Sequence, residues 1–185
     1  MEIKGTAFLA RKAMLAQEFG DARASAFLEA YAREDPFFAR MILATSTIPI
    51  DRFIAFNEAM VRDLYGGDQQ SYFRFGVKSA DWALTAGPYK HLRATKSLVQ
   101  FAESGRLLYQ NYYSEGRAET TIDGNVIDLR LLGIPAGCRH VYFELAIVGY
   151  FHRGLELVGA RAVKHRRVRG FSTGDAEVHY QYTMG

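Results

Sequence analysis

The clearest pattern in the sequence is a strict alternation of apolar and polar residues near its C-terminal end. In segment 176–184 the residues that alternate onto one face are Ala176, Val178, Tyr180, Tyr182 and Met184. Successive side chains of a strand point to opposite faces, so the segment predicts a strand with one buried face. The basic segment 161–169 and the turn GFSTGD precede it, and together they predict a β-hairpin.

A second hairpin is predicted upstream, from segment 117–123, a Gly124-Asn125 turn and segment 126–132. Its second arm also alternates, with Ile127, Leu129 and Leu131 on one face. Between the two hairpins, segment 142–158 (YFELAIVGYFHRGLELV) is apolar enough to predict a buried helix.

The first 113 residues follow a helical period instead. The apolar spacing and the Gly, Pro and Asp signals predict helices over 6–19, 21–34, 36–43, 51–65, 68–86 and 89–113, the last with a point of interruption at Gly105. We expect 45–51 (TSTIPID) to be a connector, because Pro49 prevents a helix from crossing it.

These elements predict an α+β fold. A helical N-terminal layer of five to six helices is expected to pack on a four-stranded antiparallel sheet, made of two hairpins separated by a buried helix. At 185 residues the chain is long enough to bury a full core, and we expect a single domain over 1–185, mostly helical up to 113.

Composition narrows the class of protein. Hydrophobic residues make up 49% and charged residues 23%, which is typical of a folded globular chain rather than a disordered one. A net charge of +3 argues against a dedicated nucleic-acid-binding protein. No apolar run is long enough to span a membrane and no signal-peptide pattern opens the chain, so a cytoplasmic location is expected.

Glu144 is a carboxylate on the apolar side of the predicted buried helix, where its neighbours on a helical wheel are Ile147, Val148, Phe151 and Leu155. A buried carboxylate must be paired or hydrogen-bonded. One interpretation is a polar anchor in a ligand pocket. The other is a first-turn residue satisfied by free backbone N–H groups of the helix end.

The segment 161–169 (RAVKHRRVR) is charged on both faces of its predicted strand, with Lys164 and Arg166 on one face and Arg167 on the other. Such a pattern suits an edge strand, where charges block strand-on-strand aggregation. The alternative is that Lys164, Arg166 and Arg167 bind an anion, a nucleotide or an acidic partner protein.

Aromatic residues are abundant, with 13 Phe and 11 Tyr, and at helical spacing they usually form core. Tyr109, Tyr112, Phe143 and Phe151 are also candidate walls of a ligand pocket, beside Glu144. Catalytic and metal motifs are missing: the five histidines are dispersed, and the lone Cys138 rules out a Cys-cluster zinc site. We therefore expect no resident metal and a binding protein rather than an enzyme, with a small enzyme built around Glu144 or a histidine as the alternative.

The order of elements resembles the superfamily of heme-NO-binding (H-NOX), 4-vinyl-reductase and TRAPP-subunit domains. The features that carry the resemblance are this order, the Gly-rich stretch GYFHRGLELVGA and the final alternating strand. Within the superfamily, the chain most resembles a family of uncharacterised paralogous proteins abundant in myxobacteria, whose members open with an xKGxxF-like segment, here 3–8 (IKGTAF). The resemblance implies a pocket between the helical layer and the sheet, used in related domains for heme, aromatic effectors or acyl chains.

The heme residues of the H-NOX domains are matched incompletely. Those domains use a proximal His and a Tyr-x-Ser-x-Arg motif that holds the heme propionates. Here the segment 112–117 reads Tyr-Tyr-Ser-Glu-Gly-Arg, so that Arg117 comes one residue too late, and His91 lies too close to this segment. The departures argue against heme and leave the cofactor unassigned.

These observations predict a non-enzymatic, sensory ligand-binding domain for signalling, a homodimer that holds a hydrophobic or aromatic small molecule between helices and sheet. The alternative is a protein-interaction or nucleotide-binding module that uses the basic strand 161–169.

Overall fold

The computed structural model describes all residues, 1–185, as an α+β protein whose chain divides into two compact units. The N-terminal unit is Glu2–Asp68, and the C-terminal unit is Gln69–Gly185 together with Met1. None of the helices combines the length and the apolar content that crossing a bilayer requires. That the whole chain is a single domain stays a prediction.

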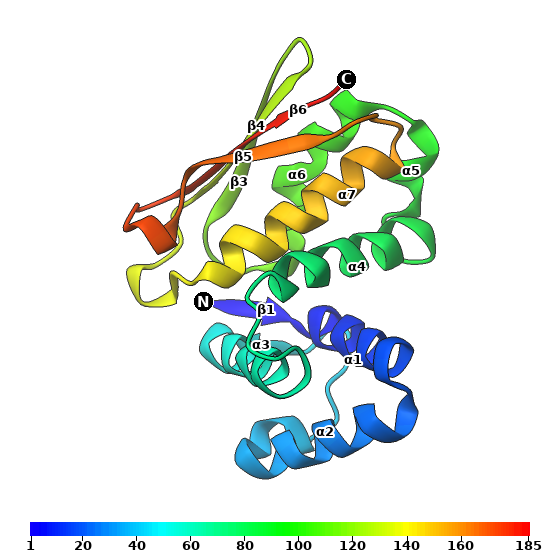
Figure 1. Cartoon of the computed structure of the whole chain (residues 1–185), viewed down its shortest axis with the longest axis vertical. Helices are drawn as coiled ribbons and strands as arrows, with labels where there is room; N and C mark the ends of the chain where they lie inside the picture. The colour runs from blue at the N-terminus through cyan, green and yellow to red at the C-terminus, as the bar shows by residue number, and fades with distance from the viewer. The chain divides into compact units, whose positions relative to one another are not determined.

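The N-terminal unit is mostly helical (Figure 1, blue to cyan). Its elements are β1 (Glu2–Lys4), α1 (Gly5–Phe19), α2 (Asp21–Glu34), the 3-10 helix η1 (Pro36–Ala39), β2 (Thr47–Pro49) and α3 (Ile50–Leu64). The two strands pair in antiparallel register, with Ile3 opposite Ile48. The connector expected over 45–51 therefore contains a strand, which Pro49 ends.

The helix predicted over 36–43 is wrong beyond Ala39. Asp35 caps the first turn as expected, since its Oδ1 accepts a hydrogen bond of 3.1 Å from the Phe37 amide. After Ala39 the chain leaves the helix and closes a turn, in which the Ser46 amide donates to the Leu43 carbonyl over 3.0 Å. This apolar stretch leaves Met41 and Leu43 exposed.

The C-terminal unit begins with three helices, α4 (Ser71–Thr85), α5 (Lys90–Thr95) and α6 (Leu98–Tyr112). The helix predicted over 89–113 is thus interrupted, but at Lys96 rather than at Gly105. Lys96 adopts the left-handed conformation, with φ of 50°, and the Ser97 hydroxyl then caps α6 through the Gln100 amide at 3.2 Å. Gly105 lies buried inside α6.

The hairpin–helix–hairpin order follows as predicted. The remaining elements are β3 (Arg117–Asp123), β4 (Val126–Leu132), the 3-10 helix η2 (Ala136–Cys138), the π-helical turn η3 (Phe143–Ile147), α7 (Val148–Leu157), β5 (Lys164–Arg169), the 3-10 helix η4 (Phe171–Thr173) and β6 (Val178–Thr183). The four strands form one antiparallel sheet in the order β3-β4-β6-β5, so the basic strand β5 is at an edge.

Helices cover one face of this sheet, with α6 against β3 and α4 along α7 (Figure 1). The alternating residues of β4 and β6 point into the core beneath them, and Tyr182 reaches α7, where its hydroxyl donates to the Val148 carbonyl over 3.1 Å. Helices α4 and α7 approach closely at Gly76 and Gly149, where an added Cβ would overlap the backbone of the facing helix. Glycines at this crossing explain part of the Gly-rich stretch.

Candidate functional site

The aromatic residues expected to wall a pocket lie in separate clusters of the C-terminal unit. Tyr109 stacks on Tyr113 with ring centroids 4.7 Å apart, and Tyr113 contacts Phe143 at 5.5 Å. Phe151 lies elsewhere, between Phe101 and Tyr182, each at 5.2 Å. The structure therefore joins Tyr109 to Phe143 through a shared neighbour and places Phe151 in a different cluster.

The fourth of these residues, Tyr112, is half-buried on α6 and faces Tyr89, with ring centroids 6.3 Å apart. Tyr109 is buried, and its hydroxyl donates to the Glu115 carbonyl over 3.0 Å. That burial, with a smaller contribution from Cys138, raises the pKa of Tyr109 well above its ordinary value, so the phenol stays neutral. A ligand-binding role for Tyr109, Tyr112, Phe143 and Phe151 stays a prediction.

Glu144 is completely buried, and three donors satisfy it, one from strand β5 and two from the β5–β6 connection. Its Oε2 accepts from Arg167 Nη1 at 3.0 Å and from Ser172 Oγ at 2.8 Å, and its Oε1 accepts from the Ser172 amide. A Cβ at Gly170 would come 2.5 Å from Oε2, so the turn needs glycine there. Backbone N–H does satisfy this carboxylate, but from a turn 28 residues later rather than from its own helix.

The cations of β5 are exposed, yet several have partners within the chain. Arg166 donates twice to Gln181 Oε1, at 3.0 and 2.8 Å, while Arg167 is held by Glu144 and Ser172. The edge position of the strand agrees with its expected role in blocking aggregation. Binding of an anion or partner by Lys164, Arg166 and Arg167 stays a prediction.

The outer face of the sheet is hollowed into a polar groove of about 400 Å³. Its lining residues are Glu119, Thr121, Asp128, Arg130, Arg169, Glu177 and His179. Opposite charges pair inside it: Glu177 binds Arg130 at 2.7 Å and Arg169 at 2.8 Å, and Asp128 lies 2.7 Å from His179 Nε2. The groove therefore offers a ligand little uncompensated charge.

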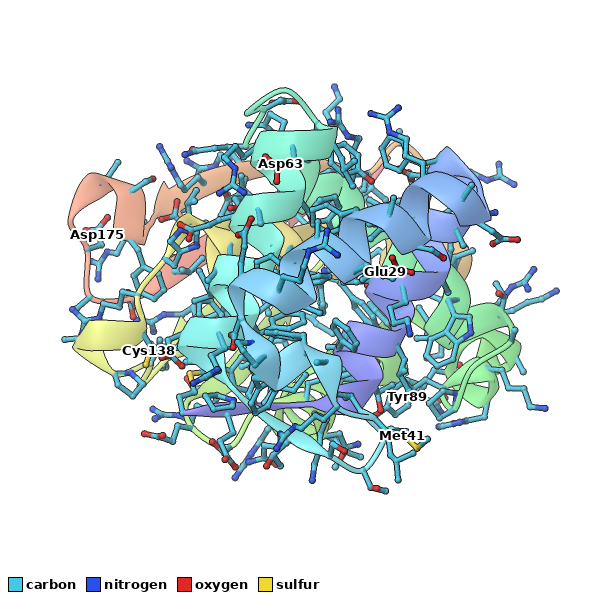
Figure 2. The ribbon with its side chains drawn as sticks, turned by 90° about the horizontal axis from the view of Figure 1, so that it is seen from below. Glu29, Met41, Asp63, Tyr89, Cys138 and Asp175 are labelled. Atoms are coloured by element: carbon cyan, nitrogen blue, oxygen red, sulfur yellow. The ribbon has the colours of Figure 1, made fainter.

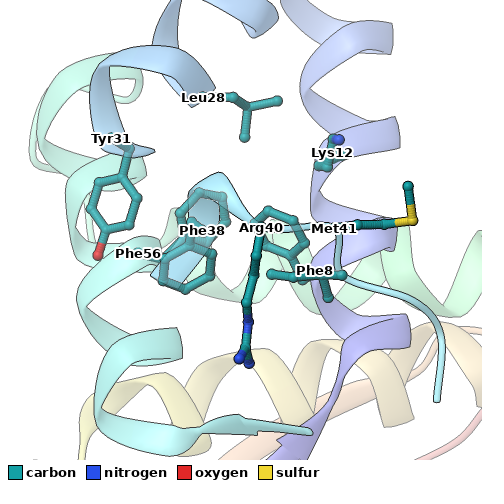
Figure 3. Close-up of a pocket in the computed structure, with 9 residues that line it drawn as sticks. Phe8, Lys12, Leu28, Tyr31, Phe38, Arg40, Met41 and Phe56 are labelled. Carbon is teal, nitrogen blue, oxygen red and sulfur yellow. The ribbon is translucent and has the colours of Figure 1, made fainter. Parts of the chain in front are cut away.

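An aromatic pocket of about 160 Å³ lies within the N-terminal unit (Figure 3). It is lined by Phe8, Lys12, Leu28, Tyr31, Phe38, Arg40, Met41, Ile42 and Phe56. The rings of Phe8, Phe38 and Phe56 form its wall, with centroids 5.1 to 5.4 Å apart. These residues come from α1, η1 and α3, so the pocket exists only once the three are packed together.

The pocket combines this apolar wall with two cations from different elements. Lys12 extends from α1, with its Nζ 5.9 Å from the centroid of Phe8. Arg40 follows η1, and its guanidinium lies 3.6 Å from the centroid of Phe37. Neither side chain makes an ion pair. Burial, followed by the charge of Asp35, raises the pKa of Tyr31 to about 12, so this lining phenol is neutral near pH 7.

The sequence pattern did not predict this pocket, although the aromatic segment Pro36-Phe37-Phe38 contributes the lining residue Phe38. The end of η1 at Ala39 and the 85% exposure of Met41, which stands at the surface in Figure 2, became visible only in the structure.

In the segment 112–117, which resembles the heme-propionate motif, the backbone conformation does not suit the motif's arginine. Gly116 stands where the motif has arginine, with φ of 81°, and a Cβ there would lie 2.7 Å from Tyr109 Oη. Arg117 opens β3 and pairs with Glu119, its Nε 2.7 Å from Oε1. An arginine at position 116 would strain the backbone, and the neighbouring Arg117 is paired with Glu119 instead.

Two of the five histidines meet in the fold, and the other three have separate surroundings. His91 is exposed on α5, His140 Nδ1 accepts from the Tyr142 amide at 3.1 Å, and His179 binds Asp128. His152 and His165 face each other, with their Nδ1 atoms 3.1 Å apart. His, Cys, Asp and Glu side chains form no group of three or more that could hold a metal ion.

No protein-family model matches the sequence, and no curated protein matches it. Solved structures match along nearly the whole chain. An H-NOX protein from S. oneidensis in the Fe(II)NO ligation state is 12% identical, with a TM-score of 0.75 and 99% of both chains covered. The H-NOX domain from Shewanella oneidensis in the Fe(II)CO ligation state is 13% identical, with a TM-score of 0.70 and 99% of both chains covered.

A third solved structure, an Fe(II) unliganded H-NOX mutant from K. algicida, is 10% identical, with a TM-score of 0.70 and coverage of 99% of this chain and 97% of that chain. At such identities the likeness establishes the fold alone. The chain has the H-NOX fold, as the resemblance predicted, and its relation to the myxobacterial paralogues stays a prediction. Its own residues at 112–117 do not fit heme held by the Tyr-x-Ser-x-Arg motif.

Proposed function

We propose that the chain is a ligand-binding, sensory domain that uses the H-NOX fold to hold a small hydrophobic or aromatic molecule other than heme. The fold supports a binding role by analogy, because solved structures with this fold are described in Fe(II)NO and Fe(II)CO ligation states. The geometry of Gly116 and Arg117 argues against heme itself. No catalytic residue is assigned, and homodimerisation, a cytoplasmic location and a role in signalling stay predictions.

The observation that carries the proposal is the aromatic pocket of the N-terminal unit. Its volume of about 160 Å³ is close to that of an engineered apolar cavity, about 150 Å³, known to bind benzene. One aromatic ring therefore fits, whereas a porphyrin is several times larger. Three packed phenylalanine rings supply edge and face contacts of the kind that aromatic ligands favour.

The pocket is also largely formed before any ligand enters. Phe8, Phe38 and Phe56 are buried and pack on one another, and Tyr31 contacts both Phe38 and Phe56, at 5.4 and 5.2 Å. A preformed apolar site avoids much of the ordering cost that weakens binding. Met41 at the mouth is exposed and has the flexible, polarisable side chain suited to covering different ligands.

Binding of neutral single-ring probes, phenol and benzyl alcohol, tests the proposal. We expect saturable shifts of amide and aromatic NMR signals from Phe8, Phe38 and Phe56, and a rise in the melting temperature. Leu28→Trp should fill the pocket and abolish both effects. Val99→Trp, at an exposed position of α6, is the matched control and should leave them unchanged.

Two results would contradict the proposal. Absence of saturable binding by either probe, with the protein folded by circular dichroism, would remove the ligand-binding claim. A stoichiometric Soret band after hemin titration, retained through gel filtration, would overturn the exclusion of heme.

A further inference from the structure

We propose that the aromatic pocket selects anionic single-ring molecules, such as small aromatic carboxylates, over neutral and cationic ones. This inference rests on the proposed function and adds the chemical class of the ligand. It follows from the side chains that border the pocket (Figure 3), among which the only two that carry charge are cations.

Lys12 and Arg40 approach the pocket from different elements, and no acidic residue lines it. Neither cation has a carboxylate partner, in contrast to the paired charges of the groove on the sheet. The nearby carboxylate of Asp35 has other partners: it forms an ion pair with Arg52 and accepts a hydrogen bond from the Phe37 amide. Glu34 and Glu58 act on Tyr31 from outside the lining, but neither pairs with Lys12 or Arg40, so the charge within the lining itself is positive.

The apolar wall amplifies the effect of these charges. A cleft with walls of low polarity that is lined by one sign of charge concentrates the opposite charge at its mouth. A ring held against Phe38 and Phe56 would leave a short polar substituent at the rim, where Lys12 and Arg40 reach. A cationic substituent there would meet like charge, and a neutral one would gain only the burial of its ring.

The lining of the pocket holds no aspartate, glutamate or histidine that would favour a cationic ligand. Tyr31 is its one lining phenol, and because its pKa is raised to about 12 it stays neutral near pH 7 and adds no negative charge to the lining.

Three probes of the same ring and similar length separate the charge from the ring: phenylacetate, 2-phenylethanol and 2-phenylethylamine. Isothermal titration calorimetry of the full chain at low and high salt should rank phenylacetate first and phenylethylamine last. Lys12→Met and Arg40→Met should each weaken phenylacetate by about two- to fivefold, the range expected for exposed ion pairs. Neither should change 2-phenylethanol.

Arg33→Met is the matched control, because Arg33 is exposed on α2 in the same unit and does not line the pocket. It should leave all three affinities within error. Added salt should weaken phenylacetate alone, since it screens exposed charges.

The outcomes distinguish the two claims. If 2-phenylethanol binds as tightly as phenylacetate, or if both cation variants leave phenylacetate unchanged, the selection for anions is wrong and the proposed function stands. If none of the three probes binds to the folded chain, the proposed function itself fails.

Discussion

The buried carboxylate of Glu144 accepts a hydrogen bond of 3.0 Å from Arg167 Nη1, which ties the π-helical turn before α7 to the edge strand β5. Glu144 is fully buried, whereas the Arg167 side chain is 41% exposed. The unequal burial decides the cost of losing each partner. A carboxylate without its cation has no access to water, while an arginine without its carboxylate does.

We expect Arg167→Met to lower the free energy of unfolding by about 1.5–3 kcal/mol, the range for a hydrogen bond to a charged group. Glu144→Ala should cost less, about 0.5–1.5 kcal/mol, because the partners that it leaves behind, Arg167 and Ser172, are exposed to water. Urea denaturation of each variant and of the double variant measures this, and the two losses should not add. Arg166→Met, on the same strand, should stay within about 0.5 kcal/mol.

Restoring the arginine of the heme motif should damage the fold rather than create a heme site. Gly116→Arg forces a side chain into a left-handed backbone, with its Cβ 2.7 Å from Tyr109 Oη. We expect a loss of about 1–3 kcal/mol in urea denaturation. Gly137→Ala, where an added Cβ meets nothing within 4 Å, is the control. A stable Gly116→Arg variant that binds hemin would contradict both expectations.

The pair His152 and His165 should make stability depend on pH. Burial, and then the charge of His152, lower the pKa of His165 below its ordinary value of 6.5. The unfolded chain therefore takes up this proton first as pH falls, so stability is lost below about pH 6.5. The effect should stay under about 1 kcal/mol, because His165 is partly exposed.

Urea denaturation at pH 7.5 and pH 5.5 measures this loss, and His165→Gln should reduce it. His91→Gln is the control, because His91 is exposed on α5. An identical pH dependence in His165→Gln and the parent chain would assign the loss to other groups.

Two buried glycines of helices in the C-terminal unit should respond in opposite directions. Gly105→Ala adds a Cβ that meets Thr120 Cγ2 at 3.4 Å, an ordinary contact, so the better helix former should stabilise by about 0.5–1 kcal/mol. Gly154→Ala drives its Cβ into the Phe101 ring and should destabilise by about 1–3 kcal/mol. Thermal unfolding of both variants measures the contrast, and a shift of the same sign in both would contradict it.

The parts of the fold that could be predicted are those with a clear local period of apolar and polar residues. The hairpin over 117–132 and the alternating strand β6 occur where the pattern placed them, because one buried face imposes a period of two. The same reasoning erred at 36–43 and at Gly105, where an apolar run and a glycine are ambiguous signals. The break in 89–113 falls instead at Lys96, where the next residue, Ser97, caps α6.

The sequence by itself determined the layered α+β architecture, the edge character of the basic strand and the departure from the heme motif. Each is a property of neighbouring residues, which a period or a spacing records. Only the tertiary structure decided the partners of Glu144, which lie 23 and 28 residues away, and the aromatic pocket, whose Phe8, Phe38 and Phe56 come from three elements. Contacts between distant segments depend on how those segments pack, and no local pattern of apolar and polar residues encodes that.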